Sequence, residues 1–374
     1  MNKILFVFGT RPEAIKMAPI INYFKNKNDF IVSVCVTAQH RHMLDQVLNF
    51  FEIFPDYDLN LMKDNQDLYD LTALILKEIK VVLNDFKPNF VFVHGDTTTS
   101  MASSLAAYYF GAKVCHVEAG LRTNNIYSPF PEEINRQITA RIADLHFSPT
   151  ESTKLNLKNE NINLKNVHVV GNSVIDALYW ALDKLKTYKD DEMIMLEDLI
   201  NPQKKIILVT GHRRENFGEG FLNICKSLNA ISKRDDVQII YPVHLNPNVQ
   251  KPVYDLLNNN MNINLINPLS YPSFVWLMNK SYLILTDSGG VQEEAPSLKK
   301  PVLVMRDHTE RIEAIESGTV KLVGTNFNNI VNSVSEILDN TDYLNQIQLI
   351  ENPYGSGNTS SLIYNSLLYY TSND

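Results

Sequence analysis

Cysteine is scarce in this chain, because its 374 residues include only Cys35, Cys115 and Cys225. No two of them have a CxxC or other metal-ligand spacing, so we expect neither a disulfide framework nor a zinc cluster, and we predict a reducing compartment. Long apolar runs are also missing. The first run, at residues 4–8, meets Gly9 almost at once and is too short for a signal peptide or a membrane span. We therefore expect a cytoplasmic protein without a membrane partner.

The chain also lacks an excess of positive charge. Its 34 lysines and arginines are outnumbered by 42 aspartates and glutamates, which argues against a general nucleic-acid partner. The first strand–helix turn is not G-x-G-x-x-G, and G-x-x-x-x-G-K-[ST] occurs nowhere, which disfavours a nicotinamide cofactor and P-loop hydrolysis. The HVE run at residues 116–118 lacks the P-C-x-x-C of zinc deaminases, and QHRH at residues 39–42 lacks a helical ligand spacing. We therefore expect no metal and no cofactor.

Short apolar runs alternate with longer amphipathic stretches along the whole chain. The length favours two domains over a single core. Near-continuous apolar strands separated by helices predict an α/β protein with parallel sheets covered by helices. One very large sheet is the less favoured alternative. The expected strands are residues 4–8, 31–37, 90–94, 114–117, 145–147, 167–170, 206–209, 237–242, 263–266, 283–286, 302–305 and 320–323.

The charged stretch at residues 184–205 predicts a surface connection, so the domain boundary is expected near it or slightly before. We place an N-terminal domain at residues 1–172 and a C-terminal domain at residues 173–355. Residues 356–374 contain a final helix that we expect to pack back on the N-terminal domain.

Both predicted domains open in the same way. FGTR at residues 8–11 and TGHR at residues 210–213 each place glycine and arginine after a first strand. Ligands of open α/β sheets bind at the carboxyl ends of the strands. Two such domains facing each other would form a cleft lined by both turns, although chance similarity of two strand–helix turns is the alternative.

The first of these turns, GTRPE, is a well-formed helix start. Thr10 and Glu13 have the capping-box spacing, and Pro12 suits the first helical turn. Arg11 and Lys16 are cations near a positive helix end, where they do not stabilise the helix. Their presence indicates an anionic ligand, and phosphate is the obvious one.

A second turn of this kind follows the apolar run at residues 283–286. Ser288 can cap a helix, while Gly289 and Gly290 allow a ligand to approach the backbone closely. One of the glutamates that follow could accept hydrogen bonds from a ribose. A capped helix with two solvated glutamates explains the turn equally well, but the later Arg311 favours a nucleoside diphosphate site.

Three carboxylates follow successive strand ends or helix starts. Asp96 and Glu118 each come after an apolar strand, and Glu132 opens a helix on which it shares a face with Arg136. Taken singly, these residues are explained by helix capping and a surface ion pair. Packed together, like charges would push one another's pKa values apart and supply both an acid and a base for proton transfer at carbon.

Two histidines lie at strand ends in the second half. His212 stands beside two arginines, and His244 follows another strand in a similar position. Either one suits a phosphate ligand or an acid, although an ordinary hydrogen-bonded histidine is the simpler interpretation of each taken alone.

Together these segments resemble the non-hydrolysing bacterial UDP-N-acetylglucosamine 2-epimerases. The similarity extends from the first strand to about Tyr354, and several long motifs in fixed order make it specific. The matching motifs are FGTRPEAIK (8–16), HGDTTT (94–99), HVEAGLR (116–122), PEE (131–133), GHRRE (211–215) and TDSGGVQEEAP (286–296).

The resemblance implies two Rossmann-like domains facing across a cleft, in a GT-B-like fold. It implies interconversion of UDP-N-acetylglucosamine and UDP-N-acetylmannosamine for surface polysaccharide synthesis, by elimination of UDP to 2-acetamidoglucal and re-addition. It also implies a homodimer, activation by the substrate itself, and no metal or NAD.

The same resemblance assigns roles to individual residues. The acid/base set would be Asp96, Glu118 and Glu132, with Lys16, Arg136 and His212 supporting the charge. The residues that hold UDP would be Arg11, His212, Ser288, Gly289, Gly290, Glu294 and Arg311. The activator would contact Gln39, His40, Arg213 and His244.

Three other functions stay open on the sequence alone. A hydrolysing 2-epimerase would release UDP and N-acetylmannosamine with the same residues. A GT-B glycosyltransferase would need an acceptor site, and the PEE helix start has no evident role there. A catalytically silent nucleotide-sugar sensor would not need the intact carboxylate set.

Overall fold

The computed structural model describes residues 1–38, 41–62 and 66–373, and the chain forms two compact units. Unit 1 comprises Met1–Trp180 and Tyr354–Asp374, and unit 2 comprises Ala181–Pro353. The chain leaves unit 1 within helix α7 (Ser173–Lys184). This helix begins in unit 1, where the ring of Trp180 lies 4.7 Å from the ring of Phe51.

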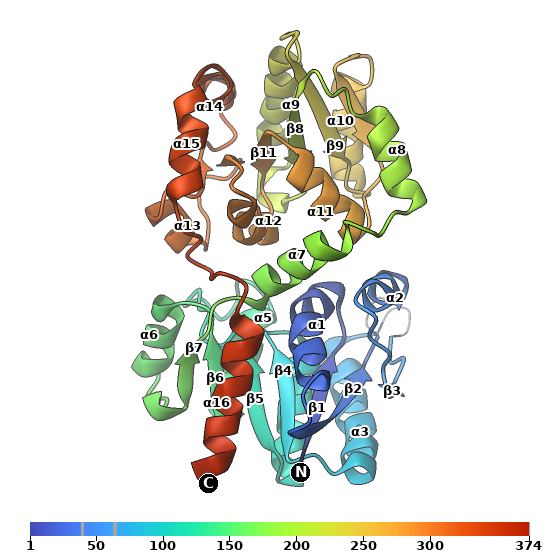
Figure 1. Ribbon diagram of the computed structural model, residues 1–374, viewed down its shortest axis with the longest axis vertical. Helices are drawn as coiled ribbons and strands as arrows, with labels where there is room; N and C mark the ends of the chain where they lie inside the picture. Colours follow the sequence, from blue (N-terminus) through green and yellow to red (C-terminus); the bar gives the residue numbers. More distant parts are fainter. Residues whose placement is uncertain (39–40, 63–65, 374) are drawn as a thin grey trace. The chain divides into compact units, whose positions relative to one another are not determined.

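Unit 1 is built on a seven-stranded sheet in which every pairing is parallel. The strand order β3-β2-β1-β4-β5-β6-β7 is the Rossmann order with one added edge strand, so the topological switch point lies between β1 and β4. Figure 1 shows these strands in blue to green. Their bounds are β1 (Asn2–Phe8), β2 (Phe30–Val36), β3 (Tyr57–Asp58), β4 (Phe90–His94), β5 (Lys113–Val117), β6 (Leu145–Ser148) and β7 (Val167–Val169).

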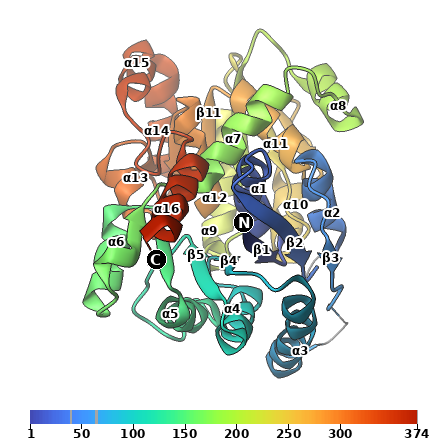
Figure 2. The same cartoon turned by 60° about the horizontal axis from the view of Figure 1, so that its bottom comes forward.

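Helices cover both faces of this sheet. They are α1 (Arg11–Lys25), α2 (Arg41–Phe50), α3 (Leu68–Phe86), α4 (Thr98–Phe110), α5 (Glu132–Ile142), α6 (Glu151–Asn159) and α16 (Thr359–Asn373). Alternate side chains of β1 point to opposite faces. Phe6 packs on Phe24 of α1, whose ring also meets Tyr364 of α16 at 5.1 Å. Leu5 and Val7 instead join a core cluster with α3 and α4, which Figure 2 shows side by side.

Unit 2 repeats the same topology with six parallel strands. Their order is β10-β9-β8-β11-β12-β13, so its switch point lies between β8 and β11. The strands are β8 (Lys205–Thr210), β9 (Val237–Pro242), β10 (Ile263–Ile266), β11 (Leu283–Thr286), β12 (Val302–Val304) and β13 (Lys321–Leu322). The helices are α8 (Asp191–Leu199), α9 (Glu219–Ile231), α10 (Pro247–Leu257), α11 (Tyr271–Lys280), α12 (Gly289–Glu294), α13 (Ile312–Glu316), α14 (Phe327–Asp339) and α15 (Thr341–Leu349).

Helix α8 lies inside the stretch predicted as a surface connection. Its start is capped by Asp190, whose Oδ1 accepts a hydrogen bond from Met193 N at 2.9 Å. Met193 and Leu196 are buried on one face of the helix. The many charged residues of this stretch favour a surface connection in the sequence analysis, and the two buried apolar residues are too few to indicate a helix.

The predicted fold class, with two α/β domains of parallel strands covered by helices, is confirmed. The predicted strands all form, with small differences at their ends, and β3 is an additional strand of two residues. Within the described residues, no helix has the length and apolar character needed to cross a membrane.

Candidate active site

Glu13 joins the two turns that flank the switch point of unit 1. Its Oε2 accepts hydrogen bonds from the backbone N–H groups of Gly9 and Thr10, at 3.1 and 2.8 Å. Its Oε1 accepts a hydrogen bond from Thr97 Oγ1 at 2.7 Å. Burial raises the pKa of Glu13, and these hydrogen bonds oppose the rise. The predicted capping box is present, and the same carboxylate positions the turn that contains Asp96.

Asp96 is held by two residues of α5. Its carboxylate is ion-paired with Arg136, and its backbone carbonyl accepts a hydrogen bond from Asn135 Nδ2 at 3.0 Å. Burial raises the pKa of Asp96; Arg136 opposes the rise, and the charges of Glu118 and Glu132 add to it. The structure therefore brings Glu118 and Glu132 close enough to Asp96 for their charges to influence it.

Glu118 follows β5 with its backbone in the left-handed region, at φ 60°. Such a conformation is uncommon for a residue other than glycine and is often found at functional sites. Its side chain is 13% exposed and ion-paired with Lys16 of α1. Glu118 Oε2 also accepts a hydrogen bond from Asn172 Nδ2 at 3.1 Å and lies 3.9 Å from His94 Nε2. Lys16 and Glu118, predicted separately, thus form a pair.

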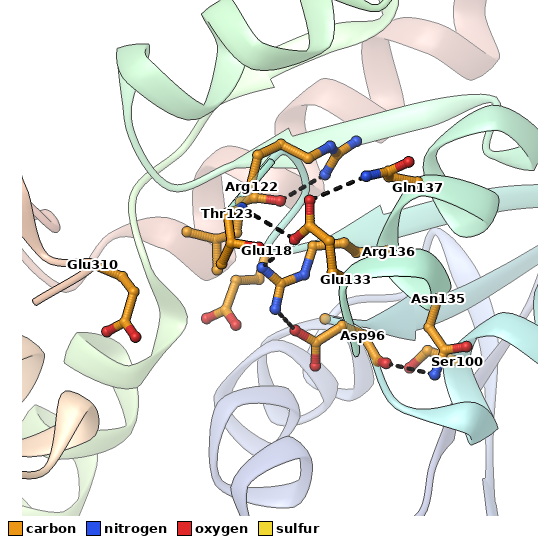
Figure 3. Close-up of polar contacts among 12 residues, drawn as sticks. Asp96, Ser100, Glu118, Arg122, Thr123, Glu133, Asn135, Arg136, Gln137 and Glu310 are labelled. Atoms are coloured by element: carbon orange, nitrogen blue, oxygen red, sulfur yellow. Dashed lines mark hydrogen bonds and ion pairs between the residues drawn. The ribbon is translucent and has the colours of Figure 1, made fainter. Parts of the chain in front are cut away.

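Two adjacent glutamates at the start of α5 have different environments. Glu133 is fully buried and accepts hydrogen bonds from Thr123 N at 3.1 Å and Gln137 Nε2 at 3.0 Å, as Figure 3 shows. Glu132 has one buried carboxylate oxygen, Oε2, with no hydrogen-bond partner among the residues that the structure describes. A buried acceptor without a partner is costly, and substrate contact is one reason to retain it.

The surface ion pair between Glu132 and Arg136, which the simpler interpretation of these residues required, is absent from the described contacts. Arg136 lies instead between Glu133, at 3.2 Å, and Asp96 (Figure 3). The physical reason is that residues 133 and 136 are three apart on the buried face of α5. Sequence reasoning missed Glu133 because its neighbour has the same side chain.

The buried side chain of His116 contacts the turn that contains Asp96. Its Nε2 lies 2.7 Å from the carbonyl oxygen of Gly95, which can only accept, so Nε2 carries the hydrogen. Burial lowers the pKa of His116 to about 3, although the contact with Gly95 opposes this. The ring is therefore neutral near pH 7 and acts as a fixed donor.

Asp287 joins the two turns at the switch point of unit 2. This fully buried residue follows β11, and its Oδ2 accepts the backbone N–H groups of His212 and Arg213, both at 2.8 Å. The His212 ring lies with Nδ1 3.4 Å from Asp287 Oδ1. Burial lowers the pKa of His212, and the charge of Asp287 opposes the shift. Sequence reasoning missed this role because it depends on β8 and β11 being neighbours.

Arg311 lies against the glycine turn that begins α12. Its guanidinium contacts Glu293 Oε1 through Nη2 at 2.8 Å and Nε at 3.1 Å. A Cβ added to Gly289 would lie 3.0 Å from the Arg311 Cζ, so the guanidinium would have to shift by a few tenths of an ångström to make room for it. Ser288 is the N-cap residue of α12, and Gly290 is its second residue. The structure thus brings Arg311 to the predicted anion turn.

Glu294 is also buried in unit 2. Its Oε1 accepts a hydrogen bond from Tyr271 OH at 3.0 Å. Glu294 is therefore not the solvated glutamate of the simpler interpretation. Another buried cation, Arg306, is held by Glu215 at 2.5 Å and Glu310 at 3.0 Å, and sequence reasoning did not select it.

Two of the four predicted activator residues lie beside His212. The rings of His212 and His244 stack with centroids 5.2 Å apart, and Arg213 Nε is buried without a hydrogen-bond partner among the described residues. Gln39 and His40 lie outside the described residues. Arg11 is the first residue of α1, at the edge that also carries the Asp96 turn.

Comparison with known proteins places this site in a family. A family model described as UDP-N-acetylglucosamine 2-epimerase matches residues 22–368. The UDP-N-acetylglucosamine 2-epimerase of Campylobacter jejuni is 55% identical, over 100% of this chain and 99% of that protein. The crystal structure of UDP-GlcNAc 2-epimerase from Neisseria meningitidis bound to UDP-GlcNAc has 53% identity and a TM-score of 0.90, over 98% of this chain and 100% of that chain. The Methanocaldococcus jannaschii UDP-GlcNAc 2-epimerase in complex with UDP-GlcNAc and UDP has 34% identity and a TM-score of 0.80, over 98% and 99% of the two chains.

The two parallel-stranded α/β units agree with the fold of these relatives. The family resemblance drawn from the sequence is therefore confirmed, and this chain belongs to the UDP-N-acetylglucosamine 2-epimerase family.

Proposed function

We propose that this chain interconverts UDP-N-acetylglucosamine and UDP-N-acetylmannosamine by inverting C2. The observation that carries the proposal is the acid cluster of unit 1, in which Asp96 is influenced by Glu118 and Glu132 and is ion-paired with Arg136. Relatives that share more than half of their residues with this chain are named UDP-N-acetylglucosamine 2-epimerases, a name that gives this substrate and its C2 carbon.

Elimination explains why the reaction needs carboxylates for proton transfer as well as an anion site. The C2 proton is not next to a carbonyl carbon, so its direct removal would leave a poorly stabilised carbanion. In the proposed reaction the C1–O bond breaks, its electron pair leaves with UDP, and a carboxylate takes the C2 proton. The product is 2-acetamidoglucal. Addition of the UDP oxygen to C1 and of a proton to the opposite face of C2 completes the inversion.

Unit 1 supplies the proton-transfer groups in this proposal. A pKa raised by burial suits Asp96 to hold and release a proton closer to neutral pH than an exposed aspartate. Glu118, fixed by Lys16, and Glu132, with its unpartnered buried oxygen, complete the set. Arg136 stabilises negative charge next to Asp96.

Unit 2 binds the leaving group in this proposal. Arg311 and the glycine turn contact the diphosphate, and preorganised donors of this kind stabilise charge that develops on the leaving oxygen. His212 is a second donor, and the buried Glu294 accepts from the ribose. The full set of proposed UDP ligands is Arg11, His212, Ser288, Gly289, Gly290, Glu294 and Arg311.

We further propose that the protein is a homodimer that its own substrate activates and that serves surface polysaccharide synthesis. Arg213 and His244 neighbour His212, so an activator bound by them would act next to a proposed catalytic residue. The complex of a relative with both UDP-GlcNAc and UDP is consistent with two nucleotide ligands. Gln39 and His40 are the other proposed contacts.

Proton NMR of the purified protein with UDP-N-acetylglucosamine in heavy water tests the proposal. The expected result is UDP-N-acetylmannosamine carrying deuterium at C2. Free N-acetylmannosamine together with UDP would replace the proposal with the hydrolysing reaction. An unchanged substrate that retains its C2 proton would contradict it and favour a sensor.

A further inference from the structure

Unit 2 contains a cavity of about 310 Å³, widely open to solvent, at the edge of its sheet opposite to the glycine turns. Its lining includes residues that precede or begin β8, β11 and β12, so it lies at the amino ends of these parallel strands. The lining is strongly basic, with the five lysines Lys204, Lys205, Lys280, Lys299 and Lys300.

These lysines have few acidic neighbours. Among the described contacts, only Lys205 has a carboxylate partner, Asp236 at 3.8 Å, and that carboxylate is already bound to Arg234 at 2.8 Å. Lys204 and Lys299 donate to neutral oxygens, at 2.7 and 2.6 Å. Each ammonium has three donors, so these contacts fix the side chains without using all of their donors.

Lys280 and Lys300 are the least compensated of the five. Neither has a hydrogen bond or an ion pair among the described contacts, and Lys280 lies over the ring of Trp276, with Nζ 5.6 Å from the centroid. Burial lowers the pKa of Lys300, and the charge of Lys280 adds to the shift. Such clustering of like charges is locally unfavourable unless an anion offsets it.

We propose that this cavity binds a small, multiply charged phosphate-type anion, with Lys280 and Lys300 as its principal ligands. The concave shape favours a small molecule over an extended polyanion. Lysine binds phosphate as a point charge on a flexible stem, which suits a ligand held by several side chains. The site is separate from the proposed UDP ligands, and the inference does not rest on the proposed function.

Lysine acylation in the presence of inorganic pyrophosphate localises the site. The protein is treated with a limiting amine-reactive ester at constant ionic strength, and modification of each lysine is measured by peptide mass spectrometry. Lys280 and Lys300 should be protected by pyrophosphate. The exposed Lys233 and Lys251 of the same unit, which do not line the cavity, should not be. Equal protection of all four, or of none, would overturn the proposal.

A double variant, Lys280→Met with Lys300→Met, tests the two ligands directly. Pyrophosphate binding to the cavity, measured by calorimetry with UDP present in excess, should weaken roughly tenfold or more. The matched control is Lys233→Met with Lys251→Met, which should bind as the parent does. Because the substitutions remove two neighbouring positive charges, the double variant should have a Tm at least as high as that of the parent without pyrophosphate, while losing the increase that pyrophosphate gives. Unchanged pyrophosphate binding in this folded variant would refute the assignment.

Separate titrations with orthophosphate, pyrophosphate and a hexose phosphate distinguish the sources of the anion. Tightest binding of the hexose phosphate would identify a phosphorylated metabolite, and tightest binding of pyrophosphate a free inorganic anion. Protection of the cavity lysines by chloride at the same ionic strength would show screening alone and would contradict a phosphate site.

Discussion

Glu133 accepts a hydrogen bond from Arg136 at 3.2 Å, and both residues lie on the buried face of α5. Arg136 reaches from this position to Asp96 (Figure 3). Glu133 therefore holds Arg136 in position, whereas Asp96 is the carboxylate whose charge Arg136 stabilises. We infer that Glu133 is a positioning residue for the acid cluster.

Replacing this carboxylate should separate positioning from stability. Glu133→Gln keeps the size of the side chain and part of its hydrogen bonding, so we expect a folded protein with a lower kcat and little change in KM. Glu133→Ala leaves buried N–H groups, including that of Thr123, without an acceptor and should lower the free energy of unfolding by about 1–3 kcal/mol. Steady-state kinetics and urea unfolding measure the two effects. The exposed Glu151→Gln serves as the control, and an unchanged kcat in Glu133→Gln would rule out positioning.

Asp96→Asn should remove proton transfer while leaving UDP binding close to that of the parent. A positioned acid or base contributes about 100- to 10,000-fold to rate, so kcat should fall within that range. The measurement is turnover of UDP-N-acetylglucosamine together with calorimetric binding of UDP. Turnover at the parental rate would remove Asp96 from the acid/base set.

Gly289→Ala should weaken UDP binding through Arg311. The added methyl would meet the guanidinium at 3.0 Å and shift it away from its present position against the turn. We expect roughly a tenfold higher Kd for UDP, the loss that follows from weakening one charge-assisted hydrogen bond. Gly220→Ala is the matched control, because its Cβ would meet Thr325 at an ordinary 3.4 Å. Equal UDP affinity in the two variants would argue against this role of the turn.

Stability should fall as the pH is lowered below about 6.5. Burial lowers the pKa of His116 to about 3 and that of His146 to about 4, from 6.5 in the unfolded chain. For each histidine, at pH values between its native and its unfolded pKa, the unfolded state binds a proton that the native state does not. Each histidine therefore reduces the free energy of unfolding by up to about 1.4 kcal/mol per pH unit as the pH falls, and has no such effect above 6.5.

Urea unfolding of the parent and of His146→Asn at several pH values measures this dependence. The variant should show a shallower loss between about pH 6 and pH 4.5, because one titrating group is missing. Identical pH dependence in the two proteins would contradict the assignment to His146.

Local sequence was sufficient for most of the fold but only for part of the site. Apolar runs predicted the strands because each is buried and bounded by turn residues, whereas β3 has only two residues and no run to detect. Asp96 and Glu118 could be selected because they follow strands directly. Glu133 could not be distinguished from Glu132, since a rotation of about 100° between neighbouring helix positions decides which one is buried.

Tertiary neighbours account for the rest of what sequence reasoning missed. The role of Asp287 depends on the pairing of β11 with β8, which brings its carboxylate to the backbone of His212. The partner of Arg136 likewise comes from another strand end. The periodicity of a sequence indicates which face of a helix or strand is apolar. It does not indicate which distant turn that helix or strand contacts.

Unit 1 is assembled from two separate stretches of chain, and this has a consequence for biosynthesis. The α16 side chain Tyr364 covers Phe24 on α1, yet the ribosome makes all of unit 2 between them. At roughly 5–20 residues per second, synthesis of the intervening chain leaves that aromatic surface uncovered for roughly 17–70 seconds. A nascent chain arrested before residue 354 would keep this surface uncovered for longer.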